Sequence, residues 1–197
     1  MNENQVLEVM AAGAMVTAAW GSLVAARWRV LVAWLAVAQL GVFALLLGAW
    51  PPAQAAAWLV AGWLTAAILG LSQQAAPAQP ESFDLGDTVL RLAVGVLGML
   101  VALSLAPQAL SWFPGSSLPR VFGGLTMVLL GLMQVGLSHH PLRVTEGLLL
   151  VLGGFGVFYA LLETSLLVTA LLAVLEIAVA LGCGYITLLL APVGEER

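Results

Sequence analysis

Charge is the scarcest property of this sequence. Lysine is absent, six arginines supply all of its cationic side chains apart from two histidines, and only 8% of the residues are charged. Such a composition lies outside the range of soluble globular domains. The single cysteine, Cys183, excludes an intramolecular disulfide and a cysteine cluster for a metal. Because no basic cluster exists, the sequence indicates neither a nucleic-acid partner nor a polybasic lipid-binding patch.

Apolar blocks fill most of the chain instead. The sequence is 62% hydrophobic, and its mean hydropathy is +1.07. A helix needs about 20 apolar residues to cross the hydrocarbon core of a bilayer. The sequence therefore predicts an all-α, polytopic integral membrane protein that forms a single membrane domain over residues 1–197. We expect seven transmembrane helices, at about 6–25, 30–49, 53–72, 88–106, 120–137, 144–162 and 165–190.

Prolines and one polar stretch divide these blocks. The prolines at 51, 52, 107, 114, 119 and 141 fall at or between the expected helix ends, where helix breakers belong. The polar segment 74–87 predicts a loop between the first three helices (1–73) and the fourth (88–106), and the last three helices occupy 119–191. The start of the chain, MNENQVLEV, carries acids where a cleavable signal peptide needs basic residues, so we expect none.

Arginine placement predicts the orientation. With the N-terminus outside, five arginines fall at cytoplasmic helix ends and only Arg120 falls outside. Cytoplasmic loops carry an excess of basic residues. We therefore expect an N-out, C-in protein in the cell's inner (cytoplasmic) membrane, with the 74–87 loop on the cytoplasmic side. The cytoplasmic arginines in this arrangement are Arg27, Arg29, Arg91, Arg143 and Arg197.

A faint internal repeat is compatible with a three plus one plus three arrangement. AQLGVFALLLG in the second helix resembles GGFGVFYALLE in the sixth, and both helices run in the same direction in the expected topology. Parallel repeats are a known membrane architecture. The alternative is that the match reflects only the abundance of Gly, Val, Phe and Leu.

Glu176 lies at the middle of the last apolar block. A charge at bilayer depth costs about 3 kcal/mol or more, so such a residue is a candidate functional site. Helical spacing places it on a face of small or polar side chains, with leucines elsewhere, so it should point into protein. One interpretation is a proton relay, because a buried carboxyl can exist in both protonation states; the other is a protonated Glu that donates one interhelical hydrogen bond. The expected face contains Thr169, Ala173, Glu176, Ala180, Cys183 and Thr187.

Four further polar side chains could support a relay. Glu146 follows Arg143 by three residues, so the two can pair on one helical face, either as an interfacial salt bridge or as a proton uptake point that feeds Glu176. Gln39 and Gln134 can hydrogen-bond across helix interfaces or join a water chain. The adjacent histidines at 139 and 140 lack the spacing for haem, so we interpret them as solvated loop residues.

Glycines concentrate in the sixth helix, where Gly147, Gly153, Gly154 and Gly156 leave the backbone exposed to a neighbour. Such positions allow helices to approach closely. We interpret this glycine pattern as a packing surface.

The stretch LLGLMQVGLSHHPLRVTEGLLLVLGGFGVFYALLETSLLVTALLAVLEIAVAL resembles the C-terminal helices of the hydrogenase-4 component E family. That region of the family is itself similar to the K subunit of NADH-quinone oxidoreductase (complex I) and to related antiporter-complex subunits. The resemblance rests on Leu142-Arg143 with Gly147, on a helix of small residues, and on a mid-membrane acid matched by Glu176. The first three helices are similar as well, through the turn AARWRV and Gln39.

Two departures from the family pattern affect its proton path. Leu149 or Leu152 stands where the family carries a second mid-membrane glutamate, and the third helix, with AGWLTAAILGL, lacks the family's lysine. Either Glu146 and water replace these groups, or the subunit keeps its place in a complex without pumping.

The resemblance implies a membrane-arm subunit of a complex I-like or membrane-bound hydrogenase-like assembly that translocates protons. Its partners would be antiporter-like membrane subunits and a peripheral module. We expect no cofactor or metal in this chain, because it carries no flavin, nucleotide, iron–sulfur or metal motif. The alternative is a non-catalytic scaffold or assembly subunit. A stand-alone small transporter ranks last, because a single buried acid provides few ionisable groups for coupled transport.

Overall fold

The computed structural model describes residues 3–75 and 84–190, and these residues form seven helices and no strand. Each helix is long and apolar enough to cross a membrane, so the chain is a multi-pass membrane protein as the sequence predicts. The helices are α1 (Glu3–Val24), α2 (Trp28–Leu46), α3 (Pro52–Ala75), α4 (Leu85–Trp112), α5 (Leu118–Leu137), α6 (Pro141–Leu162) and α7 (Leu166–Leu190).

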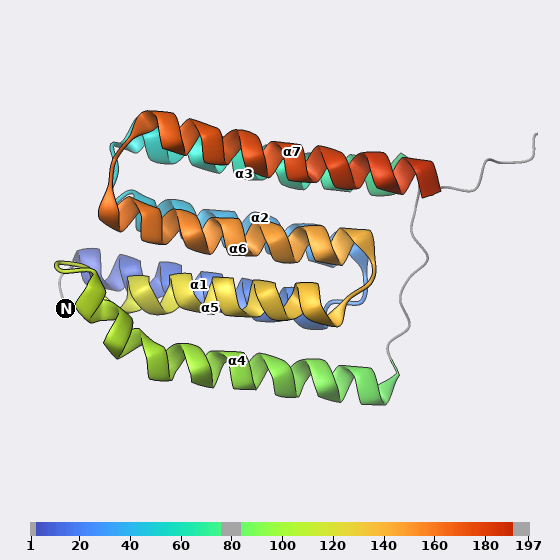
Figure 1. The fold of residues 1–197 in the computed structure, drawn as a ribbon, viewed down its shortest axis with the longest axis horizontal. Helices are drawn as coiled ribbons and strands as arrows, with labels where there is room; N and C mark the ends of the chain where they lie inside the picture. Colours follow the sequence, from blue (N-terminus) through green and yellow to red (C-terminus); the bar gives the residue numbers. More distant parts are fainter. Residues whose placement is uncertain (1–2, 76–83, 191–197) are drawn as a thin grey trace, which may run out of the picture.

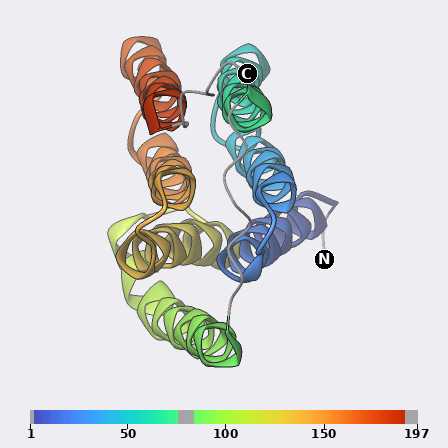
Figure 2. The ribbon, with the colours of Figure 1, turned by 90° about the vertical axis from the view of Figure 1, so that its right-hand side faces the viewer.

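The helices form two layers of three, with one helix at the edge (Figures 1 and 2). One layer contains α1, α2 and α3 in order, and the other contains α5, α6 and α7. The layers face each other so that α1 packs on α5, α2 on α6 and α3 on α7, and α4 packs mainly on α5. Because consecutive helices alternate in direction, the facing helices in each pair run parallel (Figure 1).

We divide this bundle into two halves that share α2 and α6. The α1/α5 half contains α1, α2, α5 and α6, and the α3/α7 half contains α2, α3, α6 and α7. We also call one end of the bundle the arginine end, because Arg27, Arg29, Arg91 and Arg143 lie there; α1, α3, α5 and α7 finish at it. The other end is called the opposite end.

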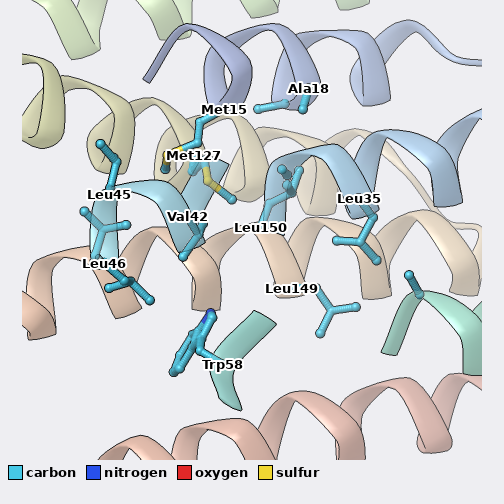
Figure 3. Packing of buried hydrophobic residues seen from close by; sticks show 14 of the residues in the cluster. Met15, Ala18, Leu35, Val42, Leu45, Leu46, Trp58, Met127, Leu149 and Leu150 are labelled. Atoms are coloured by element: carbon cyan, nitrogen blue, oxygen red, sulfur yellow. The ribbon is translucent and has the colours of Figure 1, made fainter. Parts of the chain in front are cut away.

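Apolar side chains fill the centre of the α1/α5 half. Met15 of α1 and Met127 of α5 face Val42 of α2, and all three are fully buried (Figure 3). Leu35 and Leu149, on α2 and α6, lie nearer the arginine end and are also fully buried. Dispersion contacts and the exclusion of lipid from these positions hold the two layers together.

Glycine sets the spacing between α5 and α6. A Cβ atom added to Gly147 would lie 2.7 Å from the carbonyl oxygen of Gly131, and one added to Gly154 would lie 2.7 Å from that of Gly124. The two backbones therefore touch at two levels, seven residues apart on each helix. The predicted glycine packing surface on the sixth helix is confirmed, and the structure identifies α5 as its main partner.

The predicted end of the fourth helix is wrong. We expected it to stop at 106, before Pro107, but α4 continues to Trp112 with Pro107 inside it. Figure 1 shows the helix bending toward this end. Proline is tolerated within membrane helices because neighbouring groups and local adjustments satisfy the backbone groups that it frees. Pro51 and Pro141, by contrast, lie at helix boundaries as predicted.

The polar loop is shorter than expected. We predicted it at 74–87, but α3 continues to Ala75 and α4 already begins at Leu85. The Asp84 side chain accepts a hydrogen bond from the backbone N–H of Leu85, 2.8 Å away, which caps the start of α4. Residues 76–83, like Arg197, lie outside the described residues.

Candidate functional site

A cluster of polar side chains lies in the α1/α5 half near the arginine end. The Gln134 amide of α5 is at its centre: its Nε2 donates to Glu146 Oε2 at 2.9 Å and to the carbonyl oxygen of Arg143 at 3.3 Å. The Gln134 Oε1 accepts a hydrogen bond of 3.0 Å from the Ser22 hydroxyl of α1. Gln134 therefore uses both ends of its amide and joins α1, α5 and α6, the interhelical role predicted for it.

Arg143 and Glu146 use different bonding partners within this cluster. Arg143 Nη2 donates to the backbone carbonyl of Ala25, between α1 and α2, while Glu146 takes its hydrogen bond from Gln134. Arg143 still lies close enough to attract the Glu146 carboxylate electrostatically. Both side chains are almost completely buried, at 2% and 1% exposure, whereas the sequence indicated an interfacial pair. Removal of either side chain should therefore be costly, because it would leave the other charge buried without compensation.

Glu176 lies at the centre of the α3/α7 half. Its side chain is fully buried, and it belongs to the buried face of α7 that the helical spacing predicted, with Thr169, Ala180 and Cys183. The Gln39 amide of α2, also fully buried, acts on the Glu176 carboxyl across the helix interface. The Gln39 amide is the hydrogen-bonding neighbour of the carboxyl, and no other described residue bonds the polar atoms of either side chain.

A glycine on α3 determines where Gln39 can lie. A Cβ atom added to Gly62 would lie 2.5 Å from Gln39 Cδ and 2.9 Å from its Oε1. The Gly62 carbonyl accepts a hydrogen bond of 2.6 Å from the Thr65 hydroxyl, which fixes this stretch of α3. The Gln39 amide therefore occupies the space that a side chain at position 62 would fill, and Gly62 is a positioning residue for it.

The structure does not bring Glu146 and Glu176 together. At about 1.5 Å per residue, Glu146 lies about 8 Å from the start of α6, and Glu176 lies about 21 Å from the end of α7, which extends beyond α6 at the arginine end (Figure 1). The bond of Glu146 goes to Gln134 of the α1/α5 half, whereas Glu176 faces Gln39 in the other half. Neither glutamate is described as acting on the other.

The two threonines expected to support Glu176 have different surroundings. Thr169 accepts a hydrogen bond of 2.7 Å from Gln54 Nε2 of α3, so it ties α7 to α3 near the opposite end. Thr187 donates to the Cys183 carbonyl of its own helix at 2.8 Å. Only Thr169 makes a described side-chain bond across the helix interface.

The sequence interpretation missed several buried polar groups. Arg120, the single arginine predicted at an external helix end, is buried and forms a 2.6 Å ion pair with Glu8 of α1. Gln73, near the end of α3, is fully buried, and neither polar atom of its amide has a partner among the described residues. The Trp58 ring packs edge-on against Trp50, at a centroid separation of 6.0 Å. The burial of Gln73 could have been inferred from its position as a polar residue in an apolar block. Nothing in the sequence links Glu8 to Arg120.

Comparisons of the chain with protein-family models, curated proteins and solved structures found no match. The residues of the site therefore carry the functional argument. In the part of the chain that the structure describes, no three His, Cys, Asp or Glu side chains gather into a metal-binding group. The chemistry available at Glu176 is that of one carboxyl beside one amide, which can accept and release a proton or contribute oxygen ligands.

Proposed function

We propose that this chain is a membrane-arm subunit of a complex I-like or membrane-bound hydrogenase-like assembly, in which Glu176 relays protons. The observation that carries the proposal is the state of Glu176: a fully buried carboxyl at mid-membrane whose one described polar neighbour is the uncharged Gln39 amide. Ionisable residues at this depth are costly and typically functional. The family resemblance of the sequence supports the kind of assembly.

The surroundings of Glu176 favour the relay over a purely structural role. A glutamate kept to hold two helices together would donate or accept a hydrogen bond within the bundle. Glu146 does this through Gln134 and also lies near the Arg143 guanidinium, whereas Glu176 is described with the uncharged Gln39 amide alone. Its neighbour Gln39 can both donate and accept, so it can serve either protonation state of the carboxyl.

The proposal also covers the orientation of the chain in the membrane and its neighbouring subunits. The chain would lie N-out and C-in in the inner membrane, beside antiporter-like subunits and a peripheral module. Most of α7 outside the Glu176 face is exposed and apolar, including Leu171, Val174 and Leu181, so it offers a surface to lipid or to a membrane subunit. The same surface supports the second candidate function, a scaffold subunit in which Glu176 carries no protons.

The decisive variant is Glu176→Gln, which keeps side-chain volume and polarity but removes titration. We expect the assembly to form and its proton translocation, measured in proteoliposomes, to fall severely. Glu146→Gln tests the predicted uptake point. Glu163→Gln is the matched control, because Glu163 is exposed between α6 and α7. Full translocation in an assembled Glu176→Gln complex would exclude the relay and leave the scaffold function.

Purification tests the complex itself. Tagged chain extracted in mild detergent should bring down larger polytopic subunits in fixed stoichiometry. If the chain instead translocated protons or another ion as a purified monomer, both the complex-subunit and scaffold candidates would be wrong, and a small stand-alone transporter would replace them.

A further inference from the structure

A groove lies between the start of α2 and the last turns of α3, at the arginine end of the bundle. Its volume is about 510 Å³. Small side chains of α3 leave this space, because Ala66, Ala67 and Gly70 line it. A Cβ atom added to Gly70 would meet only Val32 Cγ1, at 3.8 Å, so a side chain there would enter open space. Ala67 is exposed, so the groove is accessible from the outside of the bundle.

The polarity of the groove changes with depth. Trp28 and Arg29 begin α2, and Gln74 is the last residue but one of α3, so all three line the groove where these helices end. The Arg29 guanidinium carbon lies 5.2 Å from the centroid of the Trp28 ring. Ala66 lies about 12 Å farther along α3 than Gln74, at about 1.5 Å per residue. Arginine and tryptophan at helix ends lie at headgroup depth, so the groove has a polar rim there and apolar walls below it.

The charge of Arg29 is not balanced by the two helices that form the groove. Neither α2 nor α3 contains an acidic residue, and Arg27 adds a second positive charge at the start of α2. Arg29 forms no ion pair with a residue that the structure describes. Guanidinium groups bind phosphate oxygens through charge-assisted hydrogen bonds. The rim therefore complements a phosphate group on a molecule of net negative charge.

We propose that this groove binds one anionic phospholipid, with its phosphate on Arg29 and Gln74 and part of an acyl chain on Val32, Ala66 and Gly70. Basic pockets between membrane helices are known to bind anionic lipid headgroups. A helix of a neighbouring subunit fits less well, because it would cross a core of about 30 Å, whereas the groove follows α3 for about 12 Å. The inference goes beyond the proposed function and does not depend on proton transfer at Glu176.

Lipid binding to the complete, delipidated protein tests the charge of the site. Native mass spectrometry in detergent can compare the Kd of phosphatidylglycerol with that of phosphatidylethanolamine of identical acyl chains. One arginine near a membrane surface corresponds to about fivefold in Kd, so phosphatidylglycerol should bind about fivefold more tightly or better. A zwitterionic lipid places its ammonium group near Arg29 and Arg27. Equal affinities for the two lipids would overturn the proposal.

A matched pair of arginine variants locates the charge. Arg29→Gln should remove most of the preference for phosphatidylglycerol, because it removes the guanidinium that lines the groove. Arg27→Gln removes the same charge from the neighbouring N-cap position, which does not line the groove, and should reduce the preference less. Equal reductions in the two variants would indicate a general surface attraction and would contradict the site.

Filling the groove tests its shape without a change in charge. Gly70→Leu should abolish the preference for phosphatidylglycerol, because the leucine occupies the space of the acyl chain. Gly136→Leu is the control near the same end of the bundle, since nothing lies within 4 Å of its added Cβ, and it should bind lipid as the parent does. The Tm of each variant without lipid verifies folding. If Gly70→Leu does not fold, Ala67→Leu fills the groove from an exposed position. Parent-like binding in a folded groove-filling variant would overturn the proposal.

Discussion

The buried polar residues of the two halves of the bundle have different bonding partners. In the α1/α5 half, Gln134 is bonded at both ends of its amide, and it links Ser22 to Glu146. In the α3/α7 half, Gln39 lies equally deep, but the Glu176 carboxyl is the one group on which its amide is described as acting. The Gln134–Glu146 pair thus belongs to a network that joins three helices and includes Arg143. No charged side chain is described beside the Gln39–Glu176 pair.

The backbone packing reinforces the contrast. The α5–α6 interface brings glycine against glycine, with Gly131 facing Gly147. On the other side of the bundle, α6 and α7 share a smaller interface, and α7 relies mainly on α3. The α1/α5 half is therefore the more tightly constrained part of the molecule, and substitutions there should reduce stability most.

The largest expected effect comes from Gly147→Ala. The added methyl group would lie 2.7 Å from the Gly131 carbonyl oxygen, and backbone cannot move aside as a side chain can. Overpacking of this kind costs about 1 to 3 kcal/mol. The free energy of unfolding in mixed detergent should fall by that amount. Gly136→Ala on α5 is the control, because nothing lies within 4 Å of its added Cβ, and it should leave stability almost unchanged. Equal losses in both variants would show that the α5–α6 contact is not the cause.

A smaller difference should separate Gln134→Leu from Gln39→Leu. Removing Gln134 leaves Glu146 and the Ser22 hydroxyl without their described partner, at a cost of about 1 to 3 kcal/mol. Gln39→Leu removes one amide neighbour from Glu176 and no other described bond, so the free energy of unfolding should fall by about 1 kcal/mol or less. Both variants can be measured in the same detergent buffer. A larger loss for Gln39→Leu would reverse the comparison between the halves.

These contrasts show what the sequence can and cannot provide. The seven spans follow from hydropathy and length, because the bilayer sets both. The buried face of Glu176 follows from helical periodicity within a single helix. Its pairing with Gln39 does not, because it depends on how α2 and α7 are brought together by packing that no local pattern encodes. The Glu8–Arg120 pair is missed for the same reason.

Pro107 was interpreted as a helix end, because proline ends most helices in water. Membrane helices often continue through proline, and α4 does so.

The proposed repeat aligns Gly41 with Gly156, but Gly41 packs against Met15 of α1 and Gly156 against Trp58 of α3. The aligned glycines thus face non-equivalent neighbours, although α2 and α6 do lie side by side. The repeat remains a prediction about sequence ancestry.

The smallest expected effect is a difference in thiol accessibility, which tests which end of the bundle faces the cytoplasm. In a Cys183→Ser background, His139→Cys should react with a membrane-impermeant thiol reagent from the cytoplasmic side, and Thr164→Cys from outside. Both positions are placed at the ends of α6, and His139 and Thr164 are exposed. The opposite pattern would put the Arg143–Glu146 cluster on the external side, and Glu146 could not then collect protons from the cytoplasm.

The depth of Glu176 also affects how the protein is made. Its neighbour Gln39 belongs to α2, which is synthesised before α7, but the carboxyl must still leave the translocon within α7 before it can reach Gln39. An acid at a helix centre opposes insertion by about 3 kcal/mol, while each leucine favours it. α7 is the most hydropathic of the seven described spans and carries leucines on both sides of Glu176. The apolar excess of α7 thus offsets the insertion cost of the acid at its centre.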